Sequence, residues 1–219
     1  MGQKIRLKKL LALVGYGNKL VIDVGADHGL LSKAILDENR SEFVVATDIS
    51  SMCLKKSEAL LDCYIKNNKA KCMVSDGLIG CGNIKMCDKV IIAGMGGNEI
   101  VKILSKNPQK DIFNRFLLQP MQDADILRRF LSTNGYEIIK DEIIVERNKF
   151  YFVLEVVNTA KSKKLDELEI AFGRFYKNDN SAEFISFINY TFNSLKAREK
   201  YLSKNDLLKL SFCEKIINE

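Results

Sequence analysis

Acids and glycines alternate over a short stretch near the start of the chain, in the order Asp23-Val24-Gly25-Ala26-Asp27-His28-Gly29. An apolar run precedes this stretch and apolar residues at helical spacing follow it, which predicts a strand, a tight turn and a helix. Such turns bind nucleoside cofactors, because glycine lets a ligand approach the backbone and the start of the helix offers free N–H groups. A glycine turn that only tightens the junction between strand and helix is the alternative.

The acid at position 27 indicates which cofactor this turn would hold. A dinucleotide-binding turn has glycine at this place, and a carboxylate there would repel a pyrophosphate. S-adenosylmethionine (SAM) carries a cationic sulfonium and an ammonium group, so a turn flanked by Asp23 and Asp27 favours SAM over NAD. Asp27 would adopt the left-handed backbone conformation, which aspartate tolerates.

Two further acids end later apolar runs. Asp48 follows residues 42–47, where a carboxylate can accept hydrogen bonds from both hydroxyls of a ribose. Asp76 follows residues 70–75 and could accept from the exocyclic amine of an adenine. Each acid alone could be a helix cap or a turn residue. Acids at three successive strand ends, all on the ligand side of a sheet, predict a single binding site.

The ends of the fourth and fifth expected strands differ from the first three. The run Gly94-Met95-Gly96-Gly97 leaves bare backbone beside the methyl donor, which would admit a flat ring or a phosphate. Gln119 precedes Pro120 and offers an amide that could read the edge of a base. The alternative for Gln119 is a polar residue that closes a strand.

The order of the apolar patterns predicts an α/β fold. We expect helices between parallel strands that are buried on both faces, followed by a hairpin of two long strands joined by Arg147-Asn148. That antiparallel ending distinguishes a SAM-dependent methyltransferase sheet from a dinucleotide-binding one. The expected strands cover residues 19–24, 42–47, 70–75, 88–93, 115–119, 136–146 and 149–157, and the expected helices cover residues 29–38, 51–67, 97–105 and 123–133.

The strand pattern stops after Val157, which predicts a second domain. Residues 1–158 would form the catalytic domain, and residues 159–219 would form a helical hairpin or coiled-coil domain. Its helices are expected at 165–176, 182–202 and 206–217, and apolar residues at helical spacing predict a seam between the last two. The expected seam places Phe184, Phe187, Ile188, Thr191, Phe192 and Leu195 against Leu207, Leu208, Leu210, Phe212 and Ile216.

Composition narrows the class of protein. A chain of 219 residues that is 47% hydrophobic can bury one good core and carry a small appendage. Six cysteines without a C-x-x-C pair and the single His28 favour reduced thiols in a cytoplasmic protein over a metal site or a disulfide scaffold. No apolar run approaches the roughly 18 residues that cross a bilayer. The basic and apolar residues 4–14 predict an amphipathic helix rather than a signal peptide.

Positive charge is concentrated at the two ends of the chain. Residues 1–18 hold four bases and no acids, residues 158–219 hold 11 bases and nine acids, and bases and acids balance between them. Basic ends on either side of a neutral core would suit a polyanionic substrate that lies across the site. Ordinary solvated surface is the alternative. The basic candidates are Lys8, Lys9, Lys196, Arg198 and Lys200.

Several of these motifs together resemble one known family. The turn of residues 23–28, Asp76-Gly77-Leu78, Ile92-Ala93-Gly94-Met95-Gly96-Gly97 and Leu118-Gln119-Pro120 are similar to motifs of the bacterial TrmK family, SAM-dependent methyltransferases that modify N1 of adenine 22 in tRNA. The resemblance covers nearly the whole chain, although the C-terminal part matches by pattern only. It implies a Rossmann-like class I methyltransferase sheet with a C-terminal helical coiled-coil domain, SAM as the cofactor and tRNA as the partner. We expect no metal, no membrane association and a monomer.

The chemistry expected of such a site is modest. N1 of neutral adenine has an in-plane lone pair and needs no prior deprotonation, so position and electrostatics should account for most of the rate. The chain lacks the Asp/Asn-Pro-Pro-aromatic loop of enzymes that methylate the exocyclic N6, which favours a ring nitrogen as the target. We expect Asp27, His28 and Asp76 to stabilise the developing positive charge, although His28 could be a helix-start residue without a chemical role.

The remaining expectations concern binding. The expected cofactor-binding residues are Asp23, Gly25, Ala26, Asp27, Gly29, Asp48, Ile49, Ser75, Asp76, Gly77, Gly94, Met95 and Gly96. The expected substrate-binding residues are Gly97, Gln119, Pro120 and the five basic candidates. The alternatives are a methyltransferase of another RNA or of a protein, a nicotinamide-dependent oxidoreductase, and a non-catalytic RNA-binding protein that keeps a SAM pocket. The acid at position 27 and the terminal hairpin argue against the oxidoreductase.

Overall fold

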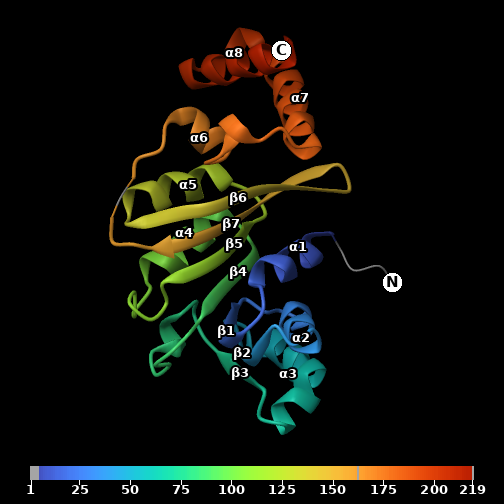
Figure 1. Ribbon diagram of the computed structural model, residues 1–219, viewed down its shortest axis with the longest axis vertical. Helices are drawn as coiled ribbons and strands as arrows, with labels where there is room; N and C mark the ends of the chain where they lie inside the picture. Colours follow the sequence, from blue (N-terminus) through green and yellow to red (C-terminus); the bar gives the residue numbers. More distant parts are fainter. Residues whose placement is uncertain (1–4, 162, 219) are drawn as a thin grey trace.

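One mixed sheet forms the centre of the molecule (Figure 1). The computed structural model describes residues 5–161 and 163–218, and in this part of the chain seven strands lie in the order β3-β2-β1-β4-β5-β7-β6. Neighbouring strands among β1 to β5 are parallel, whereas β7 is antiparallel to both β5 and β6. The predicted α/β fold with an antiparallel ending is therefore confirmed. The strands are β1 (Asn18–Val24), β2 (Ser41–Asp48), β3 (Ala70–Val74), β4 (Lys89–Met95), β5 (Arg115–Pro120), β6 (Tyr136–Glu146) and β7 (Lys149–Asn158).

Helices cover both faces of this sheet, which explains its continuous apolar strands. Along β4, Val90 and Ile92 pack in the cluster that contains α4 and α5, and Ile91 packs in the cluster that contains α1, α2 and α3. Successive strand residues point to opposite faces, so both faces of β4 must be apolar. The helices are α1 (Ile5–Val14), α2 (Leu30–Asp37), α3 (Ser51–Lys66), α4 (Gly97–Ser105) and α5 (Ala124–Thr133), each close to its predicted range.

Helix α1 lies along the sheet and is fixed near both ends. Lys89 Nζ, at the start of β4, donates to the carbonyl oxygens of Leu13 at 2.7 Å and Val14 at 3.3 Å. Arg6 Nε, in the first turn of α1, pairs with Glu146 at the end of β6 at 2.8 Å. The start of β4 and the end of β6 lie at opposite ends of the strands. The first turn of α1 therefore lies at the end of the sheet where the parallel strands finish. The amphipathic helix is confirmed from residue 5 onward, and residue 4 lies outside the described residues.

The C-terminal helices gather at one end of the molecule, beyond β6 (Figure 1). They are α6 (Glu167–Phe172), α7 (Ala182–Lys196) and α8 (Lys204–Asn218). Phe187 of α7 also contacts the hairpin, with ring centroids 5.2 Å from Phe150 and 5.3 Å from Phe152. The helices share a small core of Phe172, Tyr176, Phe184, Ile188 and Cys213. The division into two domains near residue 158 stays a prediction.

Three expectations for this region were wrong in detail. The helix expected at 165–176 ends at Phe172, because Gly173 has a φ of 109° that a helix does not accommodate. The helix expected at 182–202 ends at Lys196 and is followed by a short 3₁₀ turn. Leu207 and Leu208 are 50% and 45% exposed and lie outside the seam, because α8 buries Leu210 and Cys213 instead.

A buried ion pair fixes the C-terminal helices to the sheet. Arg128 of α5 donates from Nε and Nη2 to the two carboxylate oxygens of Asp141 on β6, at 2.7 and 2.9 Å. Its Nη1 donates to the carbonyl of Ile170 in α6 at 3.0 Å, and the backbone N–H of Arg174 donates to Asp141 at 2.9 Å. Both charged side chains are almost completely buried. A buried bidentate pair with every oxygen and nitrogen directed leaves little freedom between these three elements.

We expect Asp141→Ala to destabilise the protein by about 3 kcal/mol, because it leaves the Arg128 guanidinium buried without a counter-charge. Urea unfolding followed by circular dichroism measures this change. The matched control is Glu137→Ala, an exposed acid on the same strand, which should change the free energy of unfolding by less than about 0.5 kcal/mol. Equal free energies of unfolding for the two variants would contradict the claim that the Arg128–Asp141 pair fixes α6 to the sheet.

Candidate active site

The turn between β1 and α2 has the conformation that its sequence predicts. Gly25, Asp27 and Gly29 have φ angles of 72°, 48° and 72°, so Asp27 is in the left-handed region. The backbone N–H groups of Gly25 and Ala26 both donate to the carbonyl of Thr47 at the end of β2, at 2.8 and 2.9 Å. The turn is thereby held against the neighbouring strand, at the edge of the sheet where the parallel strands end.

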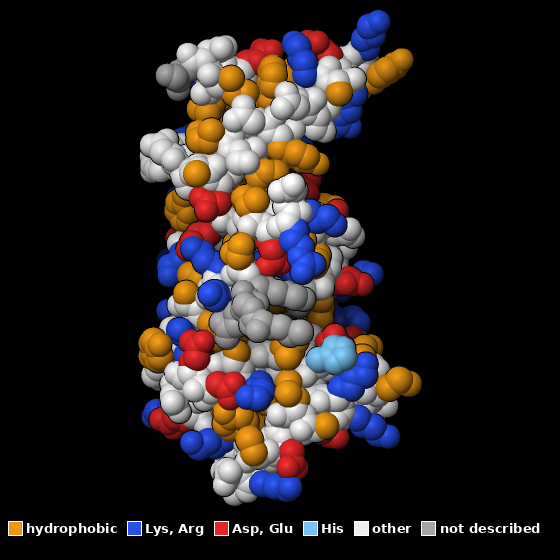
Figure 2. All heavy atoms as spheres, turned by 90° about the vertical axis from the view of Figure 1, so that its right-hand side faces the viewer, with side chains coloured by type: hydrophobic (Ala, Val, Ile, Leu, Met, Phe, Trp, Pro, Cys, Tyr) orange, Lys and Arg blue, Asp and Glu red, His pale blue; other side chains and the backbone are white. Residues whose placement is uncertain are grey.

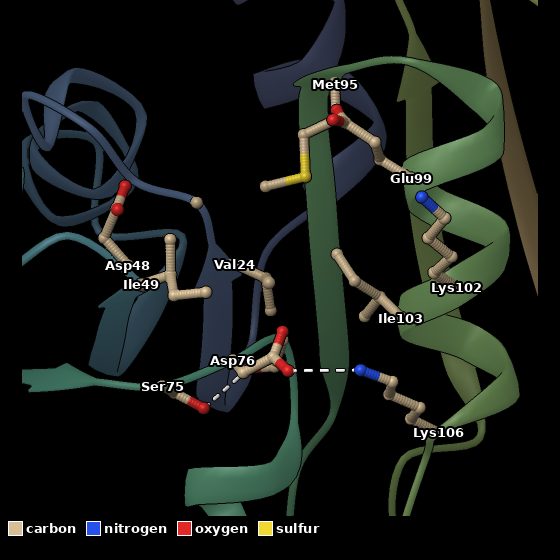
Figure 3. Close-up of a pocket in the computed structure, with 12 residues that line it drawn as sticks. Val24, Asp48, Ile49, Ser75, Asp76, Met95, Glu99, Lys102, Ile103 and Lys106 are labelled. Atoms are coloured by element: carbon tan, nitrogen blue, oxygen red, sulfur yellow. Dashed lines mark hydrogen bonds and ion pairs between the residues drawn. The ribbon is translucent and has the colours of Figure 1, made fainter.

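Two pockets open at this edge, one on each side of the turn. The first, called pocket A here, is a cavity of about 320 Å³ bounded by the ends of β1, β2 and β3 and by one face of α4 (Figure 3). The second, called pocket B, is a cavity of about 310 Å³ between the turn, the ends of β4 and β5, and the first turns of α1 and α2. Pocket A is lined by Val24, Gly25, Asp48, Ile49, Ser75, Asp76, Gly77, Met95, Glu99, Lys102, Ile103 and Lys106.

Pocket A contains the acids at the ends of β2 and β3. The two carboxylate oxygens of Asp48 accept from the backbone N–H groups of Asp27 at 3.1 Å and Ser50 at 2.8 Å. Asp76 lines the same pocket and forms an exposed ion pair at 3.2 Å with Lys106, the residue that follows α4 (Figure 3). Both acids are thus accessible to a ligand, and Asp48 is held in a fixed orientation by the turn itself.

Pocket B contains the third acid in a different environment. Asp23 is 3% exposed, and its carboxylate accepts from the hydroxyl of Ser32 at 2.7 Å. Burial raises the pKa of this carboxyl to about 6, and the hydrogen bond from Ser32 opposes only part of that rise. A cation that entered pocket B would find a carboxylate with no basic partner of its own among the described residues. Pocket B is lined by Arg6, Leu7, Leu10, Asp23, Gly25, Ala26, Asp27, His28, Leu30, Leu31, Ala93, Gly94 and Gln119.

The side chain of Met95 lines pocket A and approaches the turn at Gly25. Gly25 lines both cavities, and a Cβ atom placed on Gly25 would overlap Met95 Cε. In Figure 3 the Met95 side chain points from the end of β4 toward the turn. Glycine at position 25 is therefore required twice, by its φ of 72° and by the approach of the Met95 thioether.

The other predicted glycines divide between lining and packing. Gly77 lines pocket A, and Gly94 lines pocket B with open space where a side chain would be. Gly29 packs against Ser57, and Gly97 packs against the backbone of Asp123 so closely that a Cβ there would overlap it. The linings of the two pockets do not include Gly29, Gly96, Gly97 or Pro120.

Gln119 is buried at the inner end of pocket B. Its side chain is 2% exposed, and its Nε2 donates to the carbonyl of Pro120 at 2.9 Å. Asp27 and His28 lie at the rim of the same pocket, with 3.6 Å between Asp27 Oδ2 and His28 Nε2. The structure thus brings Asp27, His28 and Gln119 to one pocket and places Asp76 in the other.

The basic candidates differ in whether they form ion pairs. Lys196 pairs with Glu199 at 3.0 Å and Glu214 at 3.5 Å, and its expected contact with the substrate stays a prediction. Lys9 pairs with Glu142 of β6. Lys8, Arg198 and Lys200 are exposed.

Some lining residues could not be recognised individually in the sequence. Arg6 lines pocket B, stacks its guanidinium 4.3 Å from the ring centroid of Tyr151 and pairs with Glu146. On α4 and at its C-cap, four residues at helical spacing line pocket A, and this spacing was the only signal available. They are Glu99, Lys102, Ile103 and Lys106.

Metal ligands and membrane spans were also sought. Within residues 5–161 and 163–218, no three His, Cys, Asp or Glu side chains lie close enough together to hold a metal ion. No helix in that part of the chain is both long and apolar enough to cross a membrane.

Comparison with known proteins decides the family. The model of the TrmK family, described as tRNA (adenine(22)-N(1))-methyltransferase, matches residues 21–219. The chain belongs to this family. The Mycoplasma genitalium protein named "Putative tRNA methyltransferase MG248" is 32% identical over 175 residues, which cover 78% of this chain and 77% of that protein. The tRNA (adenine(22)-N(1))-methyltransferase of Bacillus subtilis is 26% identical over 76% of this chain and 71% of its own length.

Solved structures agree with the TrmK fold. A Streptococcus pneumoniae protein in complex with S-adenosyl-L-methionine matches with a TM-score of 0.85 and 24% identity, over 96% of this chain and 97% of that chain. M. capricolum TrmK in complex with S-adenosyl-homocysteine (SAH) matches with a TM-score of 0.79 and 23% identity, over 99% and 95% of the two chains. Both matches therefore include the C-terminal helices of the present chain.

The raised pKa of Asp23 predicts a dependence of stability on pH. Because the folded protein holds the Asp23 proton up to about pH 6, whereas the unfolded chain releases it near pH 3.8, ionisation of Asp23 lowers stability as the pH rises between these values. Asp23→Asn removes this loss and keeps an acceptor for Ser32. We expect the stability of the variant relative to wild type to rise by about 2 to 3 kcal/mol between pH 4 and pH 7 in urea unfolding without cofactor. If the difference in the free energy of unfolding between the two proteins stayed constant over this pH range, a raised pKa of Asp23 would be contradicted.

Proposed function

We propose that this chain transfers the methyl group of SAM to N1 of adenine 22 in tRNA, with the nucleoside of SAM in pocket A and the target adenine in pocket B. The match of the family model over residues 21–219 carries the activity. The separation of the acids supports the division of roles, because Asp48 and Asp76 line one pocket and Asp23 and Asp27 line the other.

The residues of pocket A fit a nucleoside. Each carboxylate oxygen of Asp48 accepts one backbone N–H group and keeps lone pairs for the two hydroxyls of a ribose. Ile49 is 70% exposed beside it and offers apolar surface to a purine face. Asp76 at the end of β3 would accept from the adenine amine. Bound in this way, SAM would supply an electrophilic methyl group on a cationic sulfur.

The residues near Asp23 fit the charged end of the same cofactor. Asp23 is a buried carboxylate whose charge burial disfavours, so an ammonium group brought next to it would stabilise the ionised form. Gly25 lines both pockets and has no side chain, so a cofactor that spans the two pockets would pass along its backbone. The carboxylate pair of Asp23 and Asp27 thus favours a cation and would repel a pyrophosphate.

Pocket B would orient the target adenine. The Gln119 amide donates to Pro120, which directs its carbonyl oxygen as the acceptor for an exocyclic amine. Gly94 leaves open space for a flat ring. Asp27, exposed at the rim, would stabilise the positive charge that the base gains on methylation, and no general base is required because N1 attacks through its own lone pair. His28 lies 3.6 Å from Asp27 at the same rim.

The position of Asp76 supports a role in holding the cofactor more than a role at the target base. Asp76 lines pocket A together with Asp48 and is paired with Lys106, whereas the proposed target site is in pocket B. The catalytic role expected for Asp76 from the sequence therefore passes to Asp27 in this proposal. Cytoplasmic location and a monomeric state stay predictions.

Methyl transfer to defined tRNA tests the proposed function. The purified chain is incubated with SAM and a tRNA transcript that has adenine at position 22, and the nucleosides are analysed by mass spectrometry after digestion. We expect 1-methyladenosine in this transcript and none in a matched transcript with guanine at position 22. Methylation of both transcripts would contradict the assigned position, and methylation of neither would contradict the proposed activity.

Kinetics of Asp76→Asn separate the two roles of this residue. If Asp76 only holds the cofactor, we expect the KM for SAM to rise by roughly tenfold with kcat nearly unchanged, because the ground state and the transition state lose the same interaction. Asp27→Asn serves as the comparison and should lower kcat with little change in the KM for SAM. A loss of kcat in Asp76→Asn at saturating SAM would return the catalytic role to Asp76.

A further inference from the structure

The tip of the β6–β7 hairpin projects next to pocket B. Glu146, the last residue of β6, pairs with Arg6, and Arg6 lines the pocket. Arg147 and Lys149 follow at once, and both are exposed. Neither side chain forms an ion pair or a hydrogen bond with any residue of the part that the structure describes. Two unpaired cations thus lie directly beyond one wall of the pocket.

An aromatic side chain from another element lies beside this tip. Tyr190 of α7 is 59% exposed, and its ring centroid is 5.3 Å from that of Phe150, the residue after Lys149. Phe150 in turn packs against Phe187 of the same helix, so the position of Tyr190 is fixed relative to the hairpin. Figure 2 faces this side of the molecule and shows basic side chains between His28, in pale blue, and the C-terminal helices.

The backbone conformation at the tip of the hairpin is less favourable for arginine than for asparagine or glycine. Arg147 and Asn148 have φ angles of 53° and 59°, the pattern of a two-residue turn in which Asn or Gly is preferred at both positions. Arginine at the first position costs conformational energy that asparagine would largely avoid. The conformation of the turn therefore gives no reason for an arginine at this position.

We propose that Arg147, Lys149 and Tyr190, called the basic lip here, bind the tRNA strand next to the target adenine. The two cations would contact backbone phosphates on the pocket B side, and the Tyr190 ring would stack on a neighbouring unpaired base. Cationic side chains that contact phosphates contribute affinity because counterions are released from the RNA. Aromatic side chains contribute affinity by stacking on bases. This inference rests on the proposed function, since it takes tRNA as the substrate.

The test uses the full chain with the changes Arg147→Asn and Lys149→Gln combined. Asparagine suits the left-handed turn, so the variant should unfold at the same temperature as wild type or higher. We expect tRNA affinity to fall by about tenfold at low salt, and the slope of log Kd against log salt concentration to fall by about 1.5. The Kd for SAM should not change. The matched control is Lys69→Gln combined with Lys71→Gln, two exposed lysines at the start of β3 on the opposite edge of the sheet.

A second comparison tests the stacking. Tyr190→Ala should weaken tRNA binding by at least about fivefold without changing the salt slope, and Tyr190→Phe should retain wild-type affinity. Suppose that the wild-type protein methylates tRNA. If the Arg147/Lys149 variant then has the same tRNA affinity and salt slope as the lysine control, the role of the basic lip is contradicted and the proposed function is not affected. A wild-type protein that binds SAM but does not methylate tRNA would instead contradict the proposed function.

Discussion

The contact of the glycine turn with the end of β2 is the constraint on which the rest of the site depends. Gly25 and Ala26 both donate to the carbonyl of Thr47, and Asp27 donates to the carboxylate of Asp48. These three bonds fix the turn above the edge of the sheet, and the same bonds orient Asp48 toward pocket A. The turn lies between two pockets, and Gly25 lines both of them.

The chemistry of the two pockets depends on how exposed each acid is to solvent. Asp48 and Asp76 are accessible and offer oxygens to neutral hydrogen-bond donors. Asp23 is buried, so its charged form is disfavoured until a cation arrives. A ligand with hydroxyls and an amine at one end and positive charge at the other matches this arrangement. The proposed site is therefore complementary to SAM in charge.

The substrate side depends on elements that are distant in the sequence. Helix α1 is held by Lys89 at one end of the sheet, and this brings Arg6 to pocket B at the other. The Arg128–Asp141 pair fixes the C-terminal helices, and α7 in turn supports the hairpin through Phe187 and Phe150. The surface proposed to meet RNA is thus built from both ends of the chain around one rigid sheet.

Much of the fold and part of the site could be predicted from the sequence. Parallel strands end at one edge, so the acids Asp23, Asp48 and Asp76 had to lie near one another, and the left-handed Asp27 followed from its place in the glycine turn. Which acid belongs to which pocket could not be predicted, because it depends on how α1 and α4 pack beside the turn, and these helices line different pockets. The pairing of Lys196 with Glu214 of α8 depends on how two helices pack, which apolar spacing alone does not determine.

A crystal structure of the chain with SAH tests the central claim most directly, because the claim assigns each half of the cofactor to a place. The account predicts the adenosine in pocket A, with both ribose hydroxyls on Asp48, and the ammonium group of the homocysteine beside Asp23. It also predicts that the part of pocket B in front of Gln119 stays open for the target base. Adenosine density in pocket B, or a ribose without contact to Asp48, would contradict it.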